Sequence, residues 1–293
     1  MADINTSVLL SNQLSGLIPT EISNQIVLGV KRGSFCLNNS RLEPMTKVTK
    51  SIPVLVSLPG PTFVGEGKKL GISKPQIVPV TLEAKKLAFI LTASRETLND
   101  SVLHTFDQLK DSIVDAFAVA IDKAIITGDM IEGSPVFEKT ILDVAKKQEV
   151  KRTSNIIADD IADTLAIVEG HGYNASNILA INSIKNELRK EKTTTKEPLY
   201  SDVNNLYGTP INYTNQFDSE KGYAVVGDFK NYLMTGIYQN IEYDILREST
   251  LDLGDGTTIN LGQQDLIGIR VTMRIASNVL REEPFAMVTP AQE

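Results

Sequence analysis

Two patterns of apolar and polar residues follow one another in the first half of the chain. Apolar and polar side chains alternate over residues 52–58 and again over residues 78–82. This alternation predicts the two strands of a β-hairpin, because successive side chains of a strand point to opposite faces. Over residues 94–127 the apolar residues recur every three or four positions. That spacing predicts one long amphipathic helix, which ends at Gly128.

The hairpin does not have the composition of a self-contained unit. Prolines interrupt both of its strands, among them Pro53 and Pro79. A proline within a strand favours an edge or an unpaired arm, because it cannot donate a hydrogen bond to a neighbouring strand. An isolated two-stranded hairpin is also marginally stable in water. An arm of this length therefore implies a neighbouring surface on which it lies, and hence a building block of a larger assembly.

The apolar positions change phase within the returning strand. They are even-numbered up to Leu82 and odd-numbered from Leu87 onward. A shift of one residue turns the side chains to the opposite face, so we expect a twist or a β-bulge near Lys85 and Lys86. The part before this point would belong to the arm, and the part after it to a packed sheet.

The remaining segments predict an α+β protein. The sequence predicts further helices near residues 20–27, over 156–170 and over 183–190. It predicts strands at 178–181, 223–226, 266–275 and 284–288, a turn at 207–210 and a hairpin tip at 254–256. By pattern alone the chain divides into an arm with one short helix (1–46), the hairpin with its return strand (47–92), the long helix (94–127), a mixed α/β domain (130–265) and a further β segment (266–289).

The composition narrows the classes of function. The formal net charge is −7, from 29 basic and 36 acidic residues, and no basic face of the kind that grips nucleic acid is evident. The single cysteine, Cys36, cannot form an intramolecular disulfide and suits a reducing compartment. No apolar run reaches the ~18 residues of a membrane span, and the first residues lack the pattern of a signal peptide. We expect a protein that is soluble and intracellular when it is made.

The residues that could carry chemistry form no catalytic, cofactor-binding or metal-binding pattern. The glycines of segment 65–71 match neither phosphate-binding motif and fit a flexible hairpin tip. His104 and His171 are far apart and have no zinc-ligand spacing. The paired acids at 159–160 and 282–283 fit a helix start and a solvated strand end. We therefore expect no enzyme activity, no cofactor and no metal.

Short motifs along nearly the whole chain have the order found in one known family. They are LIPTEI at 17–22, FVGEG at 63–67, TASRETLNDS at 92–101, DKAIITG at 122–128, YGTP at 207–210, VGDFKNY at 226–232, IRVTMR at 269–274 and PFA at 284–286. In this order they resemble the major capsid protein family of tailed bacteriophages, which has the Hong Kong 97-type fold. Each motif is weak alone, and their shared order carries the resemblance.

The resemblance implies a structural subunit and names its parts. It implies an N-terminal arm (1–46), an extended β-hairpin loop with its return strand (47–92), a peripheral domain with a long spine helix (93–150), a mixed α/β axial domain (151–250) and closing strands of the peripheral domain (251–293). It implies self-assembly through pentamers and hexamers into an icosahedral phage head that encloses double-stranded DNA. Portal and scaffolding proteins would be further partners, and no membrane is involved. The protein would be assembled in the host cytoplasm and would end in the virion.

The resemblance also places the tip of the extended loop on an adjacent subunit. The residues expected to make this contact are Phe63, Glu66, Gly67, Lys68, Lys69 and Lys74. Some relatives join a loop lysine to an asparagine of a neighbour by an isopeptide bond, for which Lys68, Asn278 and Glu282 are the candidates here. Such a bond needs a desolvated lysine and a well-placed carboxylate. Ion pairs of solvated tip lysines with a neighbour's acids are therefore favoured over the cross-link.

Two alternatives remain open at the level of sequence. An encapsulin-type compartment shell would keep the fold but enclose enzymes in place of a genome; the long loop tip and the motif at 17–22 favour the phage branch. A soluble α/β enzyme would be a compact monomer or dimer with a polar pocket. Only a short arm precedes the matching core, which indicates either a separate scaffolding protein or a numbering that starts after a segment was removed.

Overall fold

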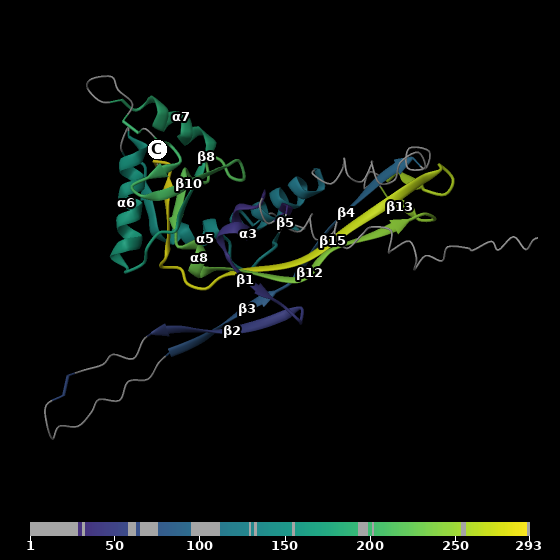
Figure 1. Ribbon diagram of the computed structural model, residues 1–293, viewed down its shortest axis with the longest axis horizontal. Helices are drawn as coiled ribbons and strands as arrows, with labels where there is room; N and C mark the ends of the chain where they lie inside the picture. Colours follow the sequence, from purple (N-terminus) through teal and green to yellow (C-terminus); the bar gives the residue numbers. More distant parts are fainter. Residues whose placement is uncertain are drawn as a thin grey trace, which may run out of the picture.

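The structure is a computed structural model that contains two β-sheets and a projecting hairpin (Figure 1). It describes residues 29–30, 33–57, 63–64, 76–94, 112–128, 130–131, 134–153, 156–192, 199–200, 202–252 and 256–291. Helices and strands are both present, as the sequence predicts. In the described part of the chain, no helix has the length and apolar content needed to cross a membrane.

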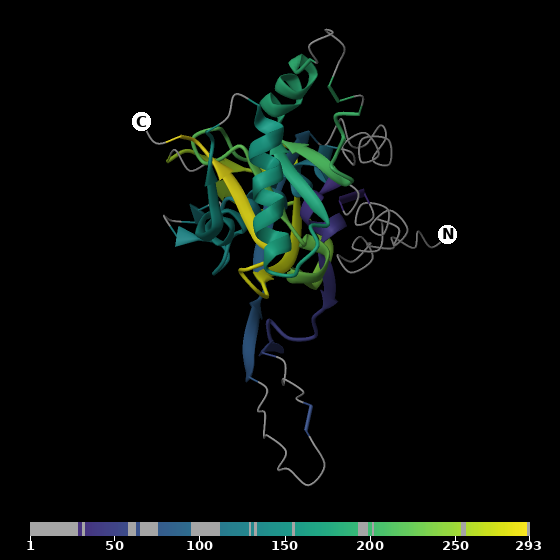
Figure 2. The same cartoon turned by 90° about the vertical axis from the view of Figure 1, so that its left-hand side faces the viewer.

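A six-stranded sheet forms one end of the molecule. Its strand order is β7-β16-β11-β8-β10-β9. The strands are β7 (Glu149–Lys151), β8 (Asn177–Ile181), β9 (Asn205–Leu206), β10 (Thr209–Thr214), β11 (Ala224–Gly227) and β16 (Phe285–Thr289). The helices that contact it are α5 (Ile141–Ala145), the 3-10 helix η1 (Lys146–Gln148), α6 (Ile157–Gly170) and α7 (Asn182–Lys190). Every residue of β8, β11 and β16 is buried, and Figure 2 shows α6 lying against the sheet.

A four-stranded sheet extends away from the first. Its order is β1-β12-β15-β4, with the strands β1 (Arg41–Pro44), β12 (Leu233–Leu246), β15 (Leu266–Val279) and β4 (Lys85–Ser94). Residues 112–126 are helical and pack on this sheet, where the rings of Phe117 and Phe89 lie 5.2 Å apart. Within β4, Phe89 is partly buried and its neighbour Ile90 is exposed. The alternation of side chains therefore directs one face of the sheet to the helix and the other to solvent.

The hairpin is a separate two-stranded sheet of β2 (Thr49–Ser57) and β3 (Gln76–Glu83). It projects from the junction of the two larger sheets (Figure 1). Ile52 faces Val80 and Val54 faces Val78 across the ladder, so the even-numbered apolar face is confirmed. The phase change is confirmed too, one residue earlier than expected: Ala84 separates β3 from β4, where the chain leaves the hairpin and enters the four-stranded sheet.

Short elements connect these parts. They are the helices α3 (Phe35–Asn39) and α8 (Phe229–Tyr232) and the two-stranded pairs of β5 (Met130–Ile131) with β6 (Ser134–Pro135) and of β13 (Thr250–Asp252) with β14 (Thr258–Asn260). The last pair confirms the hairpin predicted around residues 254–256. The turn at 207–210 is also confirmed: Tyr207 and Gly208 have φ angles of 52° and 82°, as a two-residue turn between antiparallel strands requires.

The long helix ends where the sequence predicts. Thr127 is the last residue to bond back into the helix, and Gly128 follows it with a φ of +70°, a conformation that glycine adopts without strain. Ser94, the first residue of the predicted helix, is instead the last residue of β4. The first turns expected for this helix and the short helix near residues 20–27 lie outside the described residues.

The last strands of the chain differ from the expected arrangement. Residues 284–288 were expected to lie with the strand at 266–275, but β16 belongs to the six-stranded sheet, whereas β15 belongs to the four-stranded one. The long strand β12, which lies within the segment expected as one α/β domain, also belongs to the four-stranded sheet. Alternation predicts a strand but not its neighbours, because it reports only which side chains share a face.

The two sheets share one apolar core where the chain crosses between them. The chain crosses from β11 through α8 into β12, and again from β15 into β16. At this junction the rings of Phe35 and Phe229 lie 5.2 Å apart, and those of Phe229 and Phe285 lie 5.3 Å apart. A Cβ atom on Gly227 would lie 2.4 Å from the ring of Phe285. A side chain at this glycine would therefore displace the ring of Phe285 from its packing on Phe229.

A buried carboxylate attaches the segment before β1 to the long helix. Asp122 accepts hydrogen bonds from the hydroxyl of Ser34 (2.6 Å) and from the backbone N–H groups of Phe35 (2.8 Å) and Cys36 (3.0 Å). The two backbone N–H groups are the first of α3, and the first N–H groups of a helix have no partner within that helix. Burial, with the neighbouring carboxylate of Asp122, raises the pKa of the Cys36 thiol, so Cys36 is a neutral core residue.

Candidate assembly surfaces

The hairpin carries apolar side chains that the rest of the subunit does not cover. On its odd-numbered face Leu55 lies opposite Ile77, and Pro53 lies opposite Pro79. Leu55 is 36% exposed and Ile77 is 57% exposed. Exposed apolar side chains that gather on one surface are typical of contacts with another macromolecule. The hairpin therefore fits the arm that the alternation predicts, with a surface suited to a neighbour.

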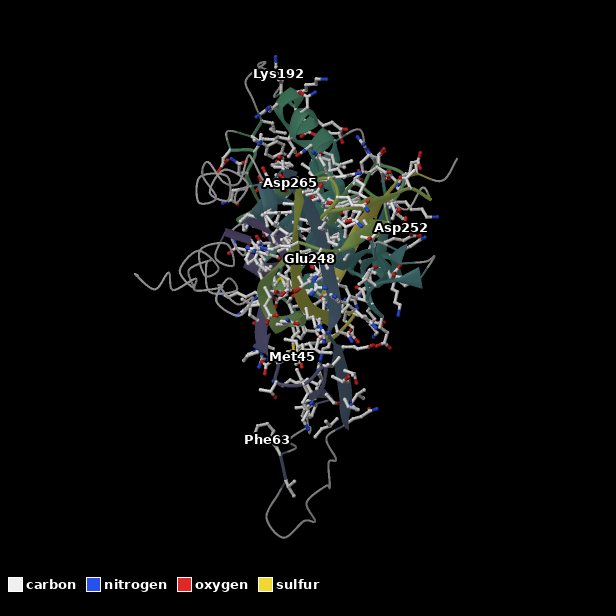
Figure 3. The ribbon with its side chains drawn as sticks, turned by 90° about the vertical axis from the view of Figure 1, so that its right-hand side faces the viewer. Met45, Phe63, Lys192, Glu248, Asp252 and Asp265 are labelled. Carbon is white, nitrogen blue, oxygen red and sulfur yellow. The ribbon has the colours of Figure 1, made fainter. Side chains whose placement is uncertain are left out.

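Phe63 is the one residue of the predicted loop contact that lies among the described residues. Its side chain is fully exposed, at 110% of the reference area, and Figure 3 shows it far from the two sheets. The other residues of the predicted contact are outside the described residues: Glu66, Gly67, Lys68, Lys69 and Lys74.

The base of the hairpin is held by a small apolar cluster of its own. The cluster is separate from the main core and consists of Met45, Leu82, Ala84, Met234 and Ala276. A Cβ atom on Gly236 would lie 2.4 Å from the sulfur of Met45. Glycine at this position of β12 therefore leaves room for the side chain of Met45 to pack directly on the strand.

Polar contacts hold the hairpin from the end of β15. The side-chain amide of Asn278, which is 3% exposed, donates to the backbone carbonyl of Thr81 in β3 at 2.8 Å. The guanidinium of Arg281 donates to the backbone carbonyl of Leu55 in β2 and, at 3.0 Å, to the hydroxyl of Tyr173. Both strands of the hairpin are thus bound by residues 278–281.

Glu282, the third cross-link candidate, forms ion pairs within the subunit. Its carboxylate lies 2.6 Å from Nζ of Lys147 and 3.0 Å from Nζ of Lys139. Hydrogen bonds from Lys147 and then Lys139 lower the pKa of Glu282. The sequence predicted a solvated strand end here, and the structure instead gives this carboxylate two partners.

Replacing Glu282 by glutamine is expected to destabilise the protein in a pH-dependent way. A carboxylate whose pKa is lower in the folded state stabilises the fold above its unfolded pKa, and this contribution is lost as the pH falls through the folded value. At pH 7 the variant should be less stable by about 1 kcal/mol or less, because both pairs are partly solvated. Urea unfolding from pH 3 to pH 8 measures the difference, which should shrink as the acid limit is approached.

The exposed neighbour Glu283 supplies the matched control. The Glu283→Gln variant should unfold like the parent at pH 7. A Glu282→Gln variant whose loss of stability is the same at pH 3 and pH 8 would contradict the ion-pair account.

The opposite end of the molecule also exposes large side chains. Tyr207, at the tip of the turn between β9 and β10, is 55% exposed, and Leu199 nearby is 45% exposed. The far end of the four-stranded sheet is acidic instead, with Glu248, Asp252 and Asp265 around the β13–β14 hairpin (Figure 3). Exposed apolar side chains also lie between these ends, among them Val119 on the helix 112–126 (51% exposed) and Ile90 on β4 (43% exposed).

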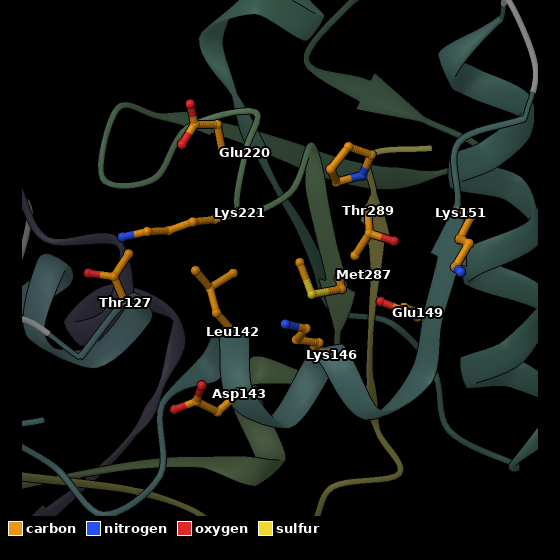
Figure 4. Close-up of a pocket in the computed structure, with 11 residues that line it drawn as sticks. Thr127, Leu142, Asp143, Lys146, Glu149, Lys151, Glu220, Lys221, Met287 and Thr289 are labelled. Carbon is orange, nitrogen blue, oxygen red and sulfur yellow. The ribbon is translucent and has the colours of Figure 1, made fainter. Parts of the chain in front are cut away.

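A pocket of about 450 Å³ lies beside the six-stranded sheet, between α5 and the end of β16 (Figure 4). Its charged side chains are of both signs, and they are Asp143, Lys146, Glu149, Lys151, Glu220 and Lys221. Its lining contains neither histidine nor cysteine. Among the residues that the structure describes, no group of His, Cys, Asp and Glu has the geometry of a metal site.

Two of the remaining candidates have ordinary structural roles. Asp159 and Asp160 lie in the first turn of α6, which confirms their interpretation as a helix start. His171 follows the same helix, and its Nδ1 lies 2.9 Å from the carbonyl of Ile167. His104 lies outside the described residues.

The sequence pattern did not reveal the roles of Asn278 and Arg281. Their partners are 197, 226 and 108 positions away in the chain. No spacing rule for neighbouring residues could have revealed these contacts.

The comparison with protein families identifies the family that has this architecture. The model of the phage capsid family matches residues 15–289. The chain belongs to the phage capsid family. It is a major capsid protein of a phage, a structural protein and not an enzyme.

Individual relatives agree with this assignment. The capsid protein is 30% identical over 292 residues to the major capsid protein of Staphylococcus phage 80alpha, covering 98% of this chain and 89% of the relative. It is 23% identical over 264 residues to a probable major capsid protein of Mycobacterium phage L5, covering 84% of this chain and 81% of the relative.

Solved structures share the fold of the capsid protein. A structure from Microbacterium phage Oxtober96 matches with a TM-score of 0.73 at 22% identity, covering 88% of this chain and 91% of that chain. A capsid chain of a native GTA particle matches with a TM-score of 0.66 at 16% identity, covering 90% of each chain. The named relatives favour a phage capsid over the compartment shell and the enzyme.

Proposed function

We propose that the capsid protein assembles through pentamers and hexamers into an icosahedral phage head that encloses double-stranded DNA. The observation that carries this proposal is the projecting hairpin, whose odd-numbered face leaves Leu55 and Ile77 exposed in the single subunit. An arm that lies on the next subunit makes a heterologous contact, which generates rings when the rotation closes. It also enlarges the interface, as suits a permanent assembly.

The parts of the subunit then take the following roles. The six-stranded sheet with α5, α6 and α7 forms the axial domain, at the centre of each ring. The four-stranded sheet and the helix that ends at Gly128, the spine helix, form the peripheral domain. The hairpin and its connecting segment form the extended loop, and residues 1–46 contribute the N-terminal arm. This division follows the sheets, so the boundary expected at residue 250 is moved.

We assign the loop contact to Phe63, Glu66, Gly67, Lys68, Lys69 and Lys74, as a packed and ion-paired surface. The full exposure of Phe63 supports this assignment. A covalent bond from Lys68 to Asn278 is not part of the proposal, because the amide of Asn278 is buried and bonded to Thr81 and Glu282 is already paired with two lysines.

The acidic balance of the chain limits its contact with DNA. A net charge of −7 keeps the inner wall from gripping the packaged DNA. Contact with DNA is therefore non-specific. Portal and scaffolding proteins are the further partners, with assembly in the host cytoplasm and a final location in the virion.

Electron microscopy of the full-length protein tests the proposal. The purified chain is expected to sediment as rings or shells, and particles from the native source should contain DNA. A protein cargo in place of DNA would favour the compartment function. A stable monomer under all conditions of salt and concentration would overturn the proposed assembly.

A further inference from the structure

The end of β15 and the turn that follows it bind to the hairpin. Asn278 bonds to the carbonyl of Thr81 in β3, and Arg281 bonds to the carbonyl of Leu55 in β2. We refer to Asn278 and Arg281 as the bracket. Since the two bonds reach opposite strands, they oppose a rotation of the hairpin about its long axis as well as a tilt.

The same turn is attached to the six-stranded sheet and its helices. A second nitrogen of the Arg281 guanidinium donates to the hydroxyl of Tyr173, just after α6. Glu282 pairs with Lys139 and Lys147, on either side of α5. The bracket is therefore fixed to the body of the subunit, and Arg281 links that body directly to the hairpin.

The residue type suits this position. A guanidinium presents several N–H donors in a rigid fork and can serve two acceptors at once, whereas the ammonium group of lysine is a single point of charge. Here the acceptors of Arg281 belong to two different parts of the subunit. Arginine thus joins them with fixed geometry.

The bracket contacts the hairpin at two points along its length, at Thr81 near the base and at Leu55, the seventh residue of β2. Strand β2 has nine residues, which corresponds to a length of about 30 Å at roughly 3.3 Å per residue. A tilt of about 10° at its base would move the far end by about 5 Å, as that strand length implies. Such a movement is larger than the width of a van der Waals contact, so it would change how the hairpin fits a neighbour.

We infer that the bracket sets the angle at which the hairpin leaves the subunit, and that this angle sets the curvature of the shell. The inference rests on the proposed function, in which the hairpin lies on the adjacent subunit. The cluster around Met45 and Leu82 holds the base of the hairpin, so loss of the bracket should loosen the angle without unfolding the subunit. Asn278 and Arg281 are positioning residues for assembly.

Hydrogen exchange of the unassembled full-length chain tests the first part. In the Arg281→Ala variant the ladder amides of β2 and β3 should exchange about tenfold faster, the effect expected for loss of a hydrogen bond to a charged group. Arg270→Ala is the matched control, because Arg270 lies on β15 and pairs with Asp244 at 2.6 Å, away from the hairpin. Unchanged exchange of the hairpin in Arg281→Ala would overturn the inference.

The diameters of assembled shells test the second part. By electron microscopy, Arg281→Ala shells should have a shifted or broadened distribution of diameters, Arg281→Lys should not restore the parental value, and Arg270→Ala shells should match the parent. Parental diameters from a variant with a loosened hairpin would overturn the role in curvature. If the parent forms no shells, the proposed function is wrong, and so is the role of the bracket in curvature. The hydrogen-exchange result would still test whether the bracket holds the hairpin.

Tyr173→Phe keeps the inference testable should Arg281→Ala fail to fold. It removes one hydroxyl and preserves the packing of the ring against Tyr232, whose centroid is 5.2 Å away. The hairpin amides should exchange about threefold faster, a smaller effect because the bond to Leu55 remains. No change in hairpin exchange or in shell diameter would overturn the link between Arg281 and the hairpin angle.

Discussion

Removing residues 61–73 and closing the gap with a short turn is expected to abolish shell assembly and to leave the subunit folded. Of this segment the structure describes Phe63 and Val64; neither belongs to the two large sheets, the main core or the cluster at the base of the hairpin, and Phe63 is fully exposed. We therefore expect the deletion to remove the contact surface without removing buried packing. Circular dichroism and urea unfolding should match the parent, while sedimentation and electron microscopy should find no closed shells.

A second variant separates the reach of the loop from its side chains. Replacing the same residues by a Gly-Ser segment of equal length preserves the connection and removes the side chains of the predicted contact. It too should fail to form shells. Normal shells from the deletion variant would show that the loop does not bridge subunits, whereas normal shells from the Gly-Ser variant alone would show that length is sufficient.

Replacing Asp122 by alanine is expected to destabilise the protein by roughly 3–5 kcal/mol, because the hydroxyl of Ser34 and two backbone N–H groups would lose a charged acceptor inside the fold. Asp122 is 7% exposed, so water cannot readily replace the carboxylate. The loss should be concentrated in α3 and β1. Urea unfolding gives the total effect, and limited proteolysis before residue 45 locates it.

The same helix offers a matched control. Asp115 is an exposed residue of the helix formed by residues 112–126. Its replacement by alanine should change the free energy of unfolding by no more than about 0.5 kcal/mol. An Asp122→Ala variant as stable as Asp115→Ala would contradict the anchoring role of Asp122. Asp122→Asn should be intermediate, because its amide retains one acceptor but turns a donor towards the N–H groups of α3.

Some elements were predictable because their signal is local. The alternation around Ile52 and Val80, the helix that ends at Gly128 and the turn at Tyr207 each follow from residues a few positions apart, and the structure confirms them. The change of apolar phase between Leu82 and Leu87 even located the passage from one sheet to another.

Other elements carried weaker signals. Strand β12 combines apolar residues with Gln239, Glu242 and Asp244, and its pairing with β15 is interrupted by register shifts after Ile237. Its alternation is therefore broken. Strand β16, by contrast, is apolar at almost every position and completely buried. A continuous apolar strand of this kind is typical of the interior of a sheet covered on both faces, and that signal indicates a buried strand without naming its neighbours.

The sequence by itself determined the class of the protein, the order of its elements and the presence of an arm too poor in packing to stand alone. Periodicity and short motifs are properties of neighbouring residues, so they can be interpreted without a fold. Only the tertiary structure decided which sheet receives β12 and β16, and which groups hold the hairpin. The bonds of Asn278 to Thr81 and of Arg281 to Leu55 and Tyr173 join residues more than 100 positions apart. Such contacts exist only after the chain has folded, because they depend on where two sheets and a hairpin meet in space.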